Sequence, residues 1–185
     1  LSAEPHYGYH FTQWSDGVTD NPRTFILTQD TTFTAEFAPN QYNISTSVDD
    51  TICGVTFGDT TATDLDYIEI TAKANYGYHF AQWSDGNTDN PRIVQVTGDA
   101  TYTAYFDKNT YTVTMNYNST EGTVSGASSG QYLDNITLTA EANYGYHFTN
   151  WNDGNTETPR VVKVTSDKTY TAYFDEIDWD YMFLL

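Results

Sequence analysis

The chain has 185 residues, 16% of them aromatic, and carries seven Lys and Arg against 25 Asp and Glu. The formal charge of −18 opposes phosphate backbones and anionic lipid headgroups, and no apolar run is long enough to cross a bilayer, so we expect neither a nucleic-acid partner nor membrane insertion. The single cysteine, Cys53, cannot form a disulfide within the chain, and we expect it to pack as a small apolar side chain.

The main feature of the sequence is a stretch, residues 76–86, that returns almost unchanged at 7–17 and 144–154. Its tryptophans recur at intervals of 69 and 68 residues, and a fixed period of this length indicates whole structural units repeated along the chain. The predicted organisation is a partial repeat that holds the C-terminal half of the pattern, two full repeats and a short tail: residues 1–41, 42–110, 111–178 and 179–185, respectively.

Apolar and polar residues alternate with a period of two within each repeat, and no stretch of ten or more residues has a helical period. Tyr42, Ile44 and Val48, for example, share one face of a predicted first strand. The sequence therefore predicts an all-β fold, a tandem and extended array of small antiparallel β-sheet repeats with about six strands in each full repeat.

The aromatic residues of the repeated stretch are the predicted core. Tyr78 and Phe80 follow the alternation, but Trp83 falls one residue out of phase, so we expect a β-bulge near Ala81-Gln82 that turns the indole inward. The predicted core positions in the three copies are Tyr9, Phe11, Trp14, Tyr78, Phe80, Trp83, Tyr146, Phe148 and Trp151. On the following strand we expect a pair of inward residues in each repeat: Phe25 and Leu27, Val94 and Val96, and Val162 and Val164.

A polar loop with an Asp-Gly pair follows each tryptophan. Asp85, Asn87 and Asp89 alternate in the manner of an oxygen-rich Ca²⁺ loop, which makes them weak candidates for metal ligands. Val18 takes the middle place in the first repeat, and no bidentate Glu stands at the twelfth position. The favoured interpretation is an Asx-rich turn, so we predict no metal and no cofactor.

Catalytic residue types occur without a catalytic arrangement. His10, His79 and His147 occupy one position per repeat with no second His or Cys nearby, and we expect a half-buried position on a sheet. Ser84, Asp85 and His79 include the residue types of a hydrolase triad, but no nucleophile elbow or oxyanion loop accompanies them. We therefore predict that the chain is not an enzyme.

Two outward-facing tyrosines support an alternative function. Tyr105 and Tyr173 could stack on sugar rings, which would make the chain a carbohydrate-binding surface module. Cross-strand Tyr and Thr pairs also stabilise sheets without any ligand, so both interpretations stay open.

The tail alternates as a first strand does, through Trp179, Tyr181, Phe183 and Leu185. Because the first repeat starts without the corresponding strands, one hypothesis is head-to-tail strand exchange between copies, which would build a filament. The favoured alternative is that both ends are boundaries within a longer array.

The repeat pattern is Gly-Tyr-x-Phe-x-x-Trp-x-Asp-Gly, followed by Asn-Pro-Arg, an alternating Val strand and a closing Thr-Tyr-Thr-Ala-x-Phe. Repeat three departs from it at Asn152, where the others have Ser, and at Thr158, where they have Asn. The pattern covers nearly the whole chain and resembles the divergent internalin-type B-repeat of bacterial surface proteins.

This resemblance implies a β-grasp-like unit, an extracellular or cell-surface location, and a non-catalytic structural or adhesive role as a stalk or filament building block. A small sandwich is the alternative arrangement for the predicted strands. The implied partners are neighbouring copies or repeats of the same protein and host or matrix glycans or proteins.

Overall fold

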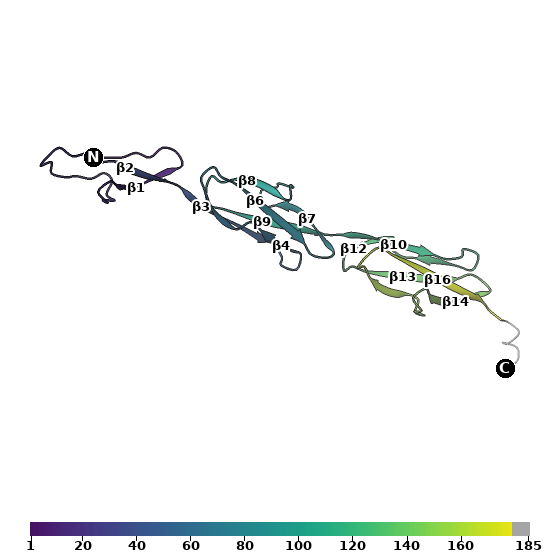
Figure 1. The fold of residues 1–185 in the computed structure, drawn as a ribbon. Helices are drawn as coiled ribbons and strands as arrows, with labels where there is room; N and C mark the ends of the chain where they lie inside the picture. Colours follow the sequence, from purple (N-terminus) through teal and green to yellow (C-terminus); the bar gives the residue numbers. More distant parts are fainter. Residues whose placement is uncertain (179–185) are drawn as a thin grey trace. The chain divides into compact units, whose positions relative to one another are not determined.

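The structure, a computed structural model, describes residues 1–178 and is built from strands, with no helix among these residues (Figure 1). No helix that could cross a membrane therefore occurs in this part of the chain. The chain forms two compact units. The first contains residues 1–75 and 80–106, and the second contains the short segment Tyr76–His79 together with the described chain from Asp107 to Asp178.

Sixteen strands are distributed over the three repeats in the described residues. Repeat one contains β1 (Tyr9–Trp14) and β2 (Ala35–Pro39). Repeat two contains β3 (Gln41–Val48), β4 (Gly54–Phe57), β5 (Thr60–Thr63), β6 (Tyr67–Ala74), β7 (Tyr78–Trp83), β8 (Arg92–Gln95) and β9 (Ala100–Lys108). Repeat three contains β10 (Thr110–Asn116), β11 (Gly122–Ser125), β12 (Ser129–Gln131), β13 (Asn135–Ala142), β14 (Tyr146–Trp151), β15 (Arg160–Lys163) and β16 (Lys168–Glu176).

Each full repeat has one four-stranded and one three-stranded sheet. The orders are β5-β3-β9-β7 and β4-β6-β8 in repeat two, and β12-β10-β16-β14 and β11-β13-β15 in repeat three. The predicted all-β class of small sheets repeated in tandem is confirmed, with seven strands in each full repeat. The additional strands are β5 and β12, whose Thr-rich and Ser-Gly sequences lack the apolar alternation that marks the others.

One strand pair in each full repeat is parallel, whereas the alternation predicted antiparallel sheets. The first strand of the repeat lies beside its last, β3 beside β9 and β10 beside β16. Between β3 and β9 the hydroxyl oxygens of Ser45 and Thr101 lie 2.8 Å apart, and those of Ser47 and Thr103 lie 2.9 Å apart. The pairing brings the two ends of each repeat together, which local alternation does not encode.

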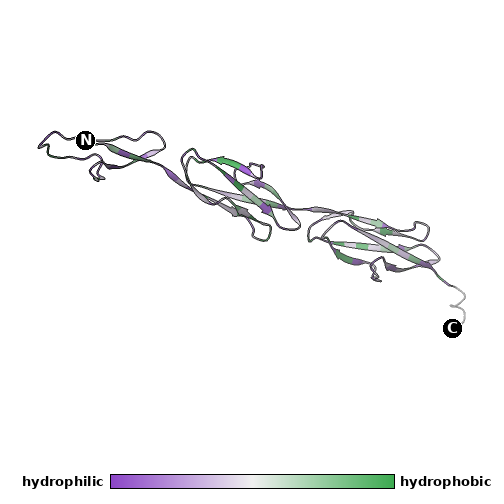
Figure 2. Cartoon of the chain, in the orientation of Figure 1, coloured by the Kyte–Doolittle hydropathy of each residue, from purple (hydrophilic) through white to green (hydrophobic). Residues whose placement is uncertain are grey.

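The two sheets of repeat three share one apolar core. It contains buried residues of β10, β14 and β16 from the larger sheet and of β13 and β15 from the smaller one, so the repeat is a small sandwich. Green and purple segments mix along these strands in Figure 2, as expected when one face of each sheet is buried. Repeat two buries Ile44, Ile70, Val94 and Phe106 at corresponding positions, and Cys53 is also buried, as predicted.

The tryptophans are the most deeply buried aromatics of the repeated stretch. Trp14, Trp83 and Trp151 are 2%, 0% and 0% exposed. The register of the strand pairs β1–β2 and β14–β16 shifts between the Phe and the Trp, which is the predicted bulge. In each copy the Phe ring lies 5.3–5.5 Å from the Trp ring and 5.8–6.1 Å from a second Phe on the closing strand.

Some predicted core positions in repeat one are wrong. Tyr9 is 50% exposed, whereas Tyr78 and Tyr146 are half-buried in the full repeats. Phe25 and Leu27 are also exposed. In repeat two, β8 lies beside β6, and in the described chain repeat one has no strand at the place of β6 against which these side chains could pack. The predicted strand through Trp179, Tyr181, Phe183 and Leu185 lies outside the described residues.

Candidate functional site: Asp-Gly loops and repeat junctions

The loop after each tryptophan is fastened by the indole itself. The Trp Nε1 donates to a backbone carbonyl six residues later at 3.0 Å in all three repeats, from Trp14 to Asp20, from Trp83 to Asp89 and from Trp151 to Glu157. The Gly of each Asp-Gly pair has a positive φ of 82–85°, so the predicted turn is confirmed. A buried indole N–H thus gains an acceptor while its ring fills the core.

An arginine and an aspartate close the same loop. In repeat three, Arg160 donates from Nη1 and Nη2 to the two carboxylate oxygens of Asp153, both at 2.8 Å. The corresponding pairs are Arg23 with Asp16 and Arg92 with Asp85. The arginine side chains are only 8–15% exposed and the aspartates 34–43%. The guanidinium therefore lies against the core while the carboxylate stays at the surface.

The other side of each guanidinium faces an aromatic ring. The carbon of the guanidinium lies 4.4 Å from the Phe33 ring for Arg23, 5.0 Å from Tyr102 for Arg92 and 5.3 Å from Tyr170 for Arg160. Cation–π contact and a bidentate carboxylate together fix the plane of the arginine. We refer to each set of Trp, Asp, Arg and this ring as the loop clamp.

The loop clamp lowers the pKa of its aspartate. The hydrogen bonds from Arg160 bring the pKa of Asp153 from 3.8 to about 2. The matching arginines lower the pKa values of Asp16 and Asp85 by the same mechanism. All three aspartates are therefore ionised at neutral pH and are committed to an internal ion pair.

Repeat three keeps the loop hydrogen bonds despite its two departures from the pattern. Asn90 in repeat two accepts from the amide of Ala72 at 2.8 Å and donates to its carbonyl at 2.6 Å. At the matching position, the single hydroxyl of Thr158 accepts from the amide of Ala140 at 2.7 Å and donates to the carbonyl of Ala140 at 3.0 Å. A hydroxyl can do this because it has one donor and two acceptor sites.

The second departure, Asn152 in place of Ser, also keeps its hydrogen bond. In repeat two the Ser84 hydroxyl accepts from the amide of Thr103 at 3.2 Å. The Asn152 side-chain oxygen accepts from the amide of Thr171 at 3.2 Å in repeat three. Both substitutions therefore preserve the geometry of the loop.

The weak metal candidates are used inside the turn. Both carboxylate oxygens of Asp85 face Arg92, and the Asn87 side-chain oxygen accepts from the amide of Asp89 at 2.8 Å. Within residues 1–178, no group of three or more His, Cys, Asp or Glu could hold a metal ion. The loop has the bonding of an Asx turn.

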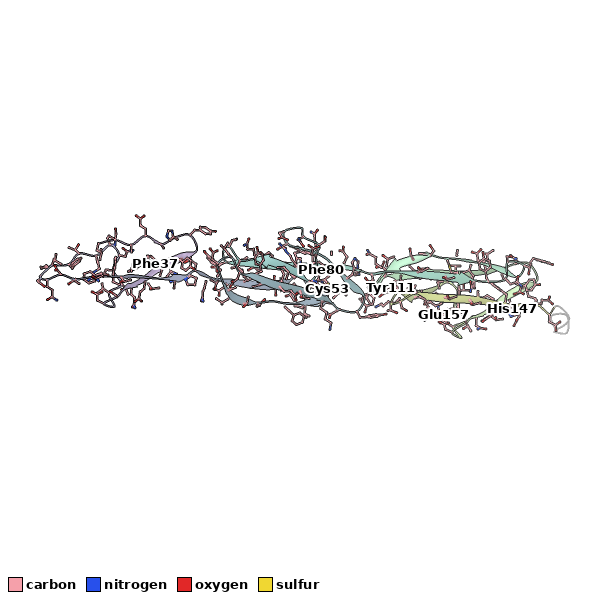
Figure 3. The ribbon with its side chains drawn as sticks, turned by 45° about the horizontal axis from the view of Figure 1, so that its top comes forward. Phe37, Cys53, Phe80, Tyr111, His147 and Glu157 are labelled. Atoms are coloured by element: carbon pink, nitrogen blue, oxygen red, sulfur yellow. The ribbon has the colours of Figure 1, made fainter. Side chains whose placement is uncertain are left out.

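The candidate triad residues each contact a different partner. Ser84 accepts from Thr103, Asp85 binds Arg92, and the His79 Nδ1 lies 2.8 Å from the Asn109 side-chain oxygen. The expectation of half-buried histidines is wrong, because His10, His79 and His147 are exposed on their strands. His147 is labelled in Figure 3. The three histidines are exposed because the alternation places them on the opposite face of the strand from the neighbouring Tyr and Phe.

Where repeats follow one another, the same backbone bonds occur twice. At the first junction, within the first unit, the Asn40 amide donates to the Gly8 carbonyl at 2.8 Å and the Asp64 amide donates to the Asn40 carbonyl at 2.9 Å. At the second junction, within the second unit, Asn109 donates to Gly77 and Tyr132 donates to Asn109, both at 2.8 Å. Position 64 of repeat two thus corresponds to position 132 of repeat three.

Tyrosines cover the second junction. The Tyr132 ring lies 5.6 Å from each of the Tyr76 and Tyr78 rings, at interplanar angles of 83° and 76°, and 6.5 Å from Tyr111. Tyr111 lies near the start of β10 (Figure 3). The Tyr132 ring also rests on Gly77, leaving no room for a Cβ there. We refer to these four tyrosines as the tyrosine cluster.

The hydroxyl of Tyr76 is held although 68% of this residue is exposed. It donates to the Thr165 carbonyl at 2.7 Å. Desolvation, with a smaller contribution from Tyr111, raises the pKa of Tyr76. One edge of the contact is thus the Tyr76 ring against Tyr132, and the other is its hydroxyl on Thr165, while much of the residue stays in solvent.

The first junction has an acid where the second has an aromatic ring. Asp64 lies with Oδ2 against Gly8, and its Oδ1 is buried without a hydrogen-bond partner. Beside this junction runs an open groove, lined by His10, Ala38, Pro39, Asn40, Gln41 and Tyr42.

The outward tyrosines of the closing strands lie as predicted. Tyr105 on β9 is 40% exposed and Tyr173 on β16 is 49% exposed. Both side chains are therefore partly accessible from solvent.

Sequence reasoning missed two features. The recurring Pro-Arg pairs were visible, but their aspartate partners stand seven residues earlier, across the loop. The difference between Asp64 and Tyr132 lies outside the repeated stretch. An alignment of the repeats at Leu65 and Leu133, which are equivalent and both have a positive φ, reveals it one residue earlier.

Comparison with known proteins agrees with this architecture. The sequence model of one family, the divergent InlB B-repeat domain, matches residues 1–41, 44–110 and 111–178. Comparisons with curated proteins and with solved structures gave no significant match. The family is one of repeat modules found in bacterial surface proteins, and its match covers nearly all of the chain in three consecutive copies. The chain belongs to the divergent InlB B-repeat family.

Proposed function

We propose that this chain is a non-catalytic structural segment of a bacterial cell-surface protein, in which the repeats serve as a stalk or spacer. The observation that carries the proposal is the loop clamp. The same Trp, Asp and Arg contacts occur three times, at nearly the same distances, and each contact is made within its own repeat. Residues that make these contacts within their own repeat stabilise a unit that can be repeated along a chain.

The side chains of types that are used in catalysis support the same proposal. Asp85 is neutralised by Arg92, Ser84 binds a backbone amide, and His79 faces Asn109. A nucleophile, a base and an orienting acid would have to contact one another to catalyse hydrolysis, and these three residues have other partners. The remaining acidic side chains give a solvated surface with strong negative charge.

The test is a deletion experiment on the parent protein at the bacterial surface. If the repeats are a spacer, deleting the domain beyond them while keeping the repeats abolishes attachment to cells or matrix. Replacing the repeats by an unrelated β-rich spacer of similar length preserves attachment. Attachment mediated by the repeats alone would overturn the spacer role in favour of an adhesive one.

A second candidate function is glycan binding. It is favoured by the exposed rings of Tyr105 and Tyr173 and by the groove at the first junction, where Tyr42 lies beside the amides of Asn40 and Gln41. Ring faces combined with amide groups suit the apolar faces and hydroxyls of sugars.

Titration of the chain against a glycan panel separates the two functions. Specific binding that is lost in Tyr105→Ala, in Tyr173→Ala or in Tyr42→Ala would support a carbohydrate-binding module and identify the surface. No binding across the panel would leave the spacer role as the better account.

A further inference from the structure

We infer that the residue at position 64 or 132 determines whether a repeat docks against the Tyr-Gly-Tyr loop of the repeat before it. Tyr132 makes repeat three a receptor for the segment Tyr76–His79, whereas the matching segment of repeat one, beside Asp64, has no aromatic ring contact within residues 1–178. The inference concerns the junctions alone and holds whether the chain is a spacer or binds a glycan.

The receptor surface in repeat three is small and specific. Its centre is the Tyr132 ring, which contacts Tyr76 and Tyr78 edge to face and seals Gly77. The Thr165 carbonyl, at the rim, accepts the Tyr76 hydroxyl. Edge-to-face aromatic pairs add stability beyond the area that they bury.

The segment that enters this surface already belongs to the second unit. Residues 76–79 cluster with the described chain from Asp107 to Asp178, although their sequence is part of repeat two. The structural boundary between the units therefore does not coincide with the repeat boundary. At the first junction the matching segment, residues 7–10, lies in the first unit together with repeat two.

The first junction provides a natural comparison. Its backbone bonds, from Asn40 to Gly8 and from Asp64 to Asn40, match those of the second junction within 0.1 Å. Its histidine also faces the same asparagine, with His10 Nδ1 3.1 Å from the Asn40 side-chain oxygen. The joints also differ around the shared asparagine, with Pro39 and Gln41 at the first and Lys108 and Thr110 at the second. The residue whose amide bonds to that asparagine is Asp64 at the first junction and Tyr132 at the second, and a carboxylate cannot reproduce the edge-to-face contacts of a ring.

The inference fits one kind of partner, a Tyr-Gly-Tyr-His loop of a preceding B-repeat. Glycine is required in the middle because a Cβ would overlap the Tyr132 ring. Aromatic residues are required on both sides because each flanking tyrosine contacts that ring. A repeat with an acid at this position would be a poor receptor for the same loop.

The experiment is a reciprocal exchange in the full chain, with Tyr132→Asp and Asp64→Tyr made separately and amide hydrogen exchange measured by NMR. The reporters are the amides of Asn109 and Asn40, which make the same backbone bond at the two junctions. Tyr132→Asp should speed exchange at Asn109 by about tenfold, because two aromatic contacts over the bond are lost. Asp64→Tyr should slow exchange at Asn40 by a similar factor.

Control measurements separate docking from general stability. Tyr132→Phe retains the ring and should leave Asn109 as protected as in the unmodified chain. The amide of Trp151, within repeat three, should exchange at an unchanged rate in every folded variant. If Asn109 exchanges equally in Tyr132→Asp and in the unmodified chain while Trp151 stays protected, the inference is wrong. If Tyr132→Asp fails to fold, Asp64→Tyr is the deciding variant. Slower exchange at Asn40 in that variant supports the inference, and an unchanged exchange rate at Asn40 overturns it.

Discussion

The loop clamps and the repeat junctions respond differently to sequence change. In the loop that the clamp closes in repeat three, Thr158 replaces Asn and Asn152 replaces Ser, yet both hydrogen-bond patterns persist. At the junctions, one difference between Asp64 and Tyr132 changes how the Tyr-Gly-Tyr segment is covered. The hydrogen bonds at these two loop positions therefore depend on hydrogen-bonding capacity, which several residues can provide, whereas the junction contact depends on the shape of one side chain.

The largest effect is expected at the clamp residue on which both the loop and the core depend. Trp83→Ala removes a fully buried ring and its bond to Asp89, and should lower the free energy of unfolding of repeat two by about 3–5 kcal/mol. Chemical denaturation followed by circular dichroism checks it. Tyr105→Ala, at an exposed site on β9, should change stability by less than about 0.5 kcal/mol. An unmoved transition in Trp83→Ala would refute the core assignment.

The next effect sharpens the description of the junction. Gly77 and Gly145 have φ values of +86° and +88°, so alanine strains the backbone equally at both sites. Only at Gly77 does the new Cβ meet a ring, since nothing in the described residues lies within 4 Å at Gly145. Gly77→Ala should therefore cost about 1–3 kcal/mol more than Gly145→Ala in thermal unfolding. Equal losses would mean that Tyr132 does not pack on Gly77 in solution.

Thr158 tests whether the loop beside the clamp depends on hydrogen-bonding capacity. Thr158→Val is nearly the same shape but leaves the amide and carbonyl of Ala140 without their partner, at a cost of about 1–3 kcal/mol. Thr158→Asn introduces the residue used in repeats one and two, and should keep most of the stability. Differential scanning calorimetry distinguishes them, and a harmless Thr158→Val would contradict the role given to the hydroxyl.

The smallest effect comes from the ion pair of the clamp. The pKa of Asp153 is depressed from 3.8 to about 2 in the folded chain, so its contribution to stability is fully present well above pH 3.8 and is lost as pH falls toward 2. Because the pair is partly exposed, Asp153→Asn should cost only about 0.2–1 kcal/mol at pH 7. The stability of Asp153→Asn should depend less on pH between 4 and 2 than that of the unmodified chain. An identical pH profile would rule out this linkage.

Local patterns were sufficient to predict the repeats and much of their interior. The out-of-phase Trp83 predicted a bulge, and the Asp-Gly pairs predicted turns with positive φ, because both are set by neighbouring residues. The parallel pairing of β3 with β9 joins residues 56 positions apart, so no local alternation reveals it.

The junctions were harder to predict for a related reason. Tyr132 and Tyr76 are far apart in sequence, and the sequence before Leu133 gives no sign that its tyrosine covers Gly77. Arg92 and Asp85 are only seven residues apart, but the loop between them has no periodicity that would place one over the other. Contacts of these kinds emerge only once the chain is folded.

The most direct test of the difference between clamps and junctions is amide exchange across the unmodified chain, with each rate normalised to its intrinsic value. In the loops closed by the clamps, the backbone amides of Trp83 and Trp151 donate to the carbonyls of Asn87 and Asn155, both at 2.8 Å. At the junctions, the amides of Asn40 and Asn109 donate to the carbonyls of Gly8 and Gly77, also at 2.8 Å. We predict similar protection for the two tryptophans and about tenfold slower exchange at Asn109 than at Asn40. Equal or faster exchange at Asn109 would contradict the account.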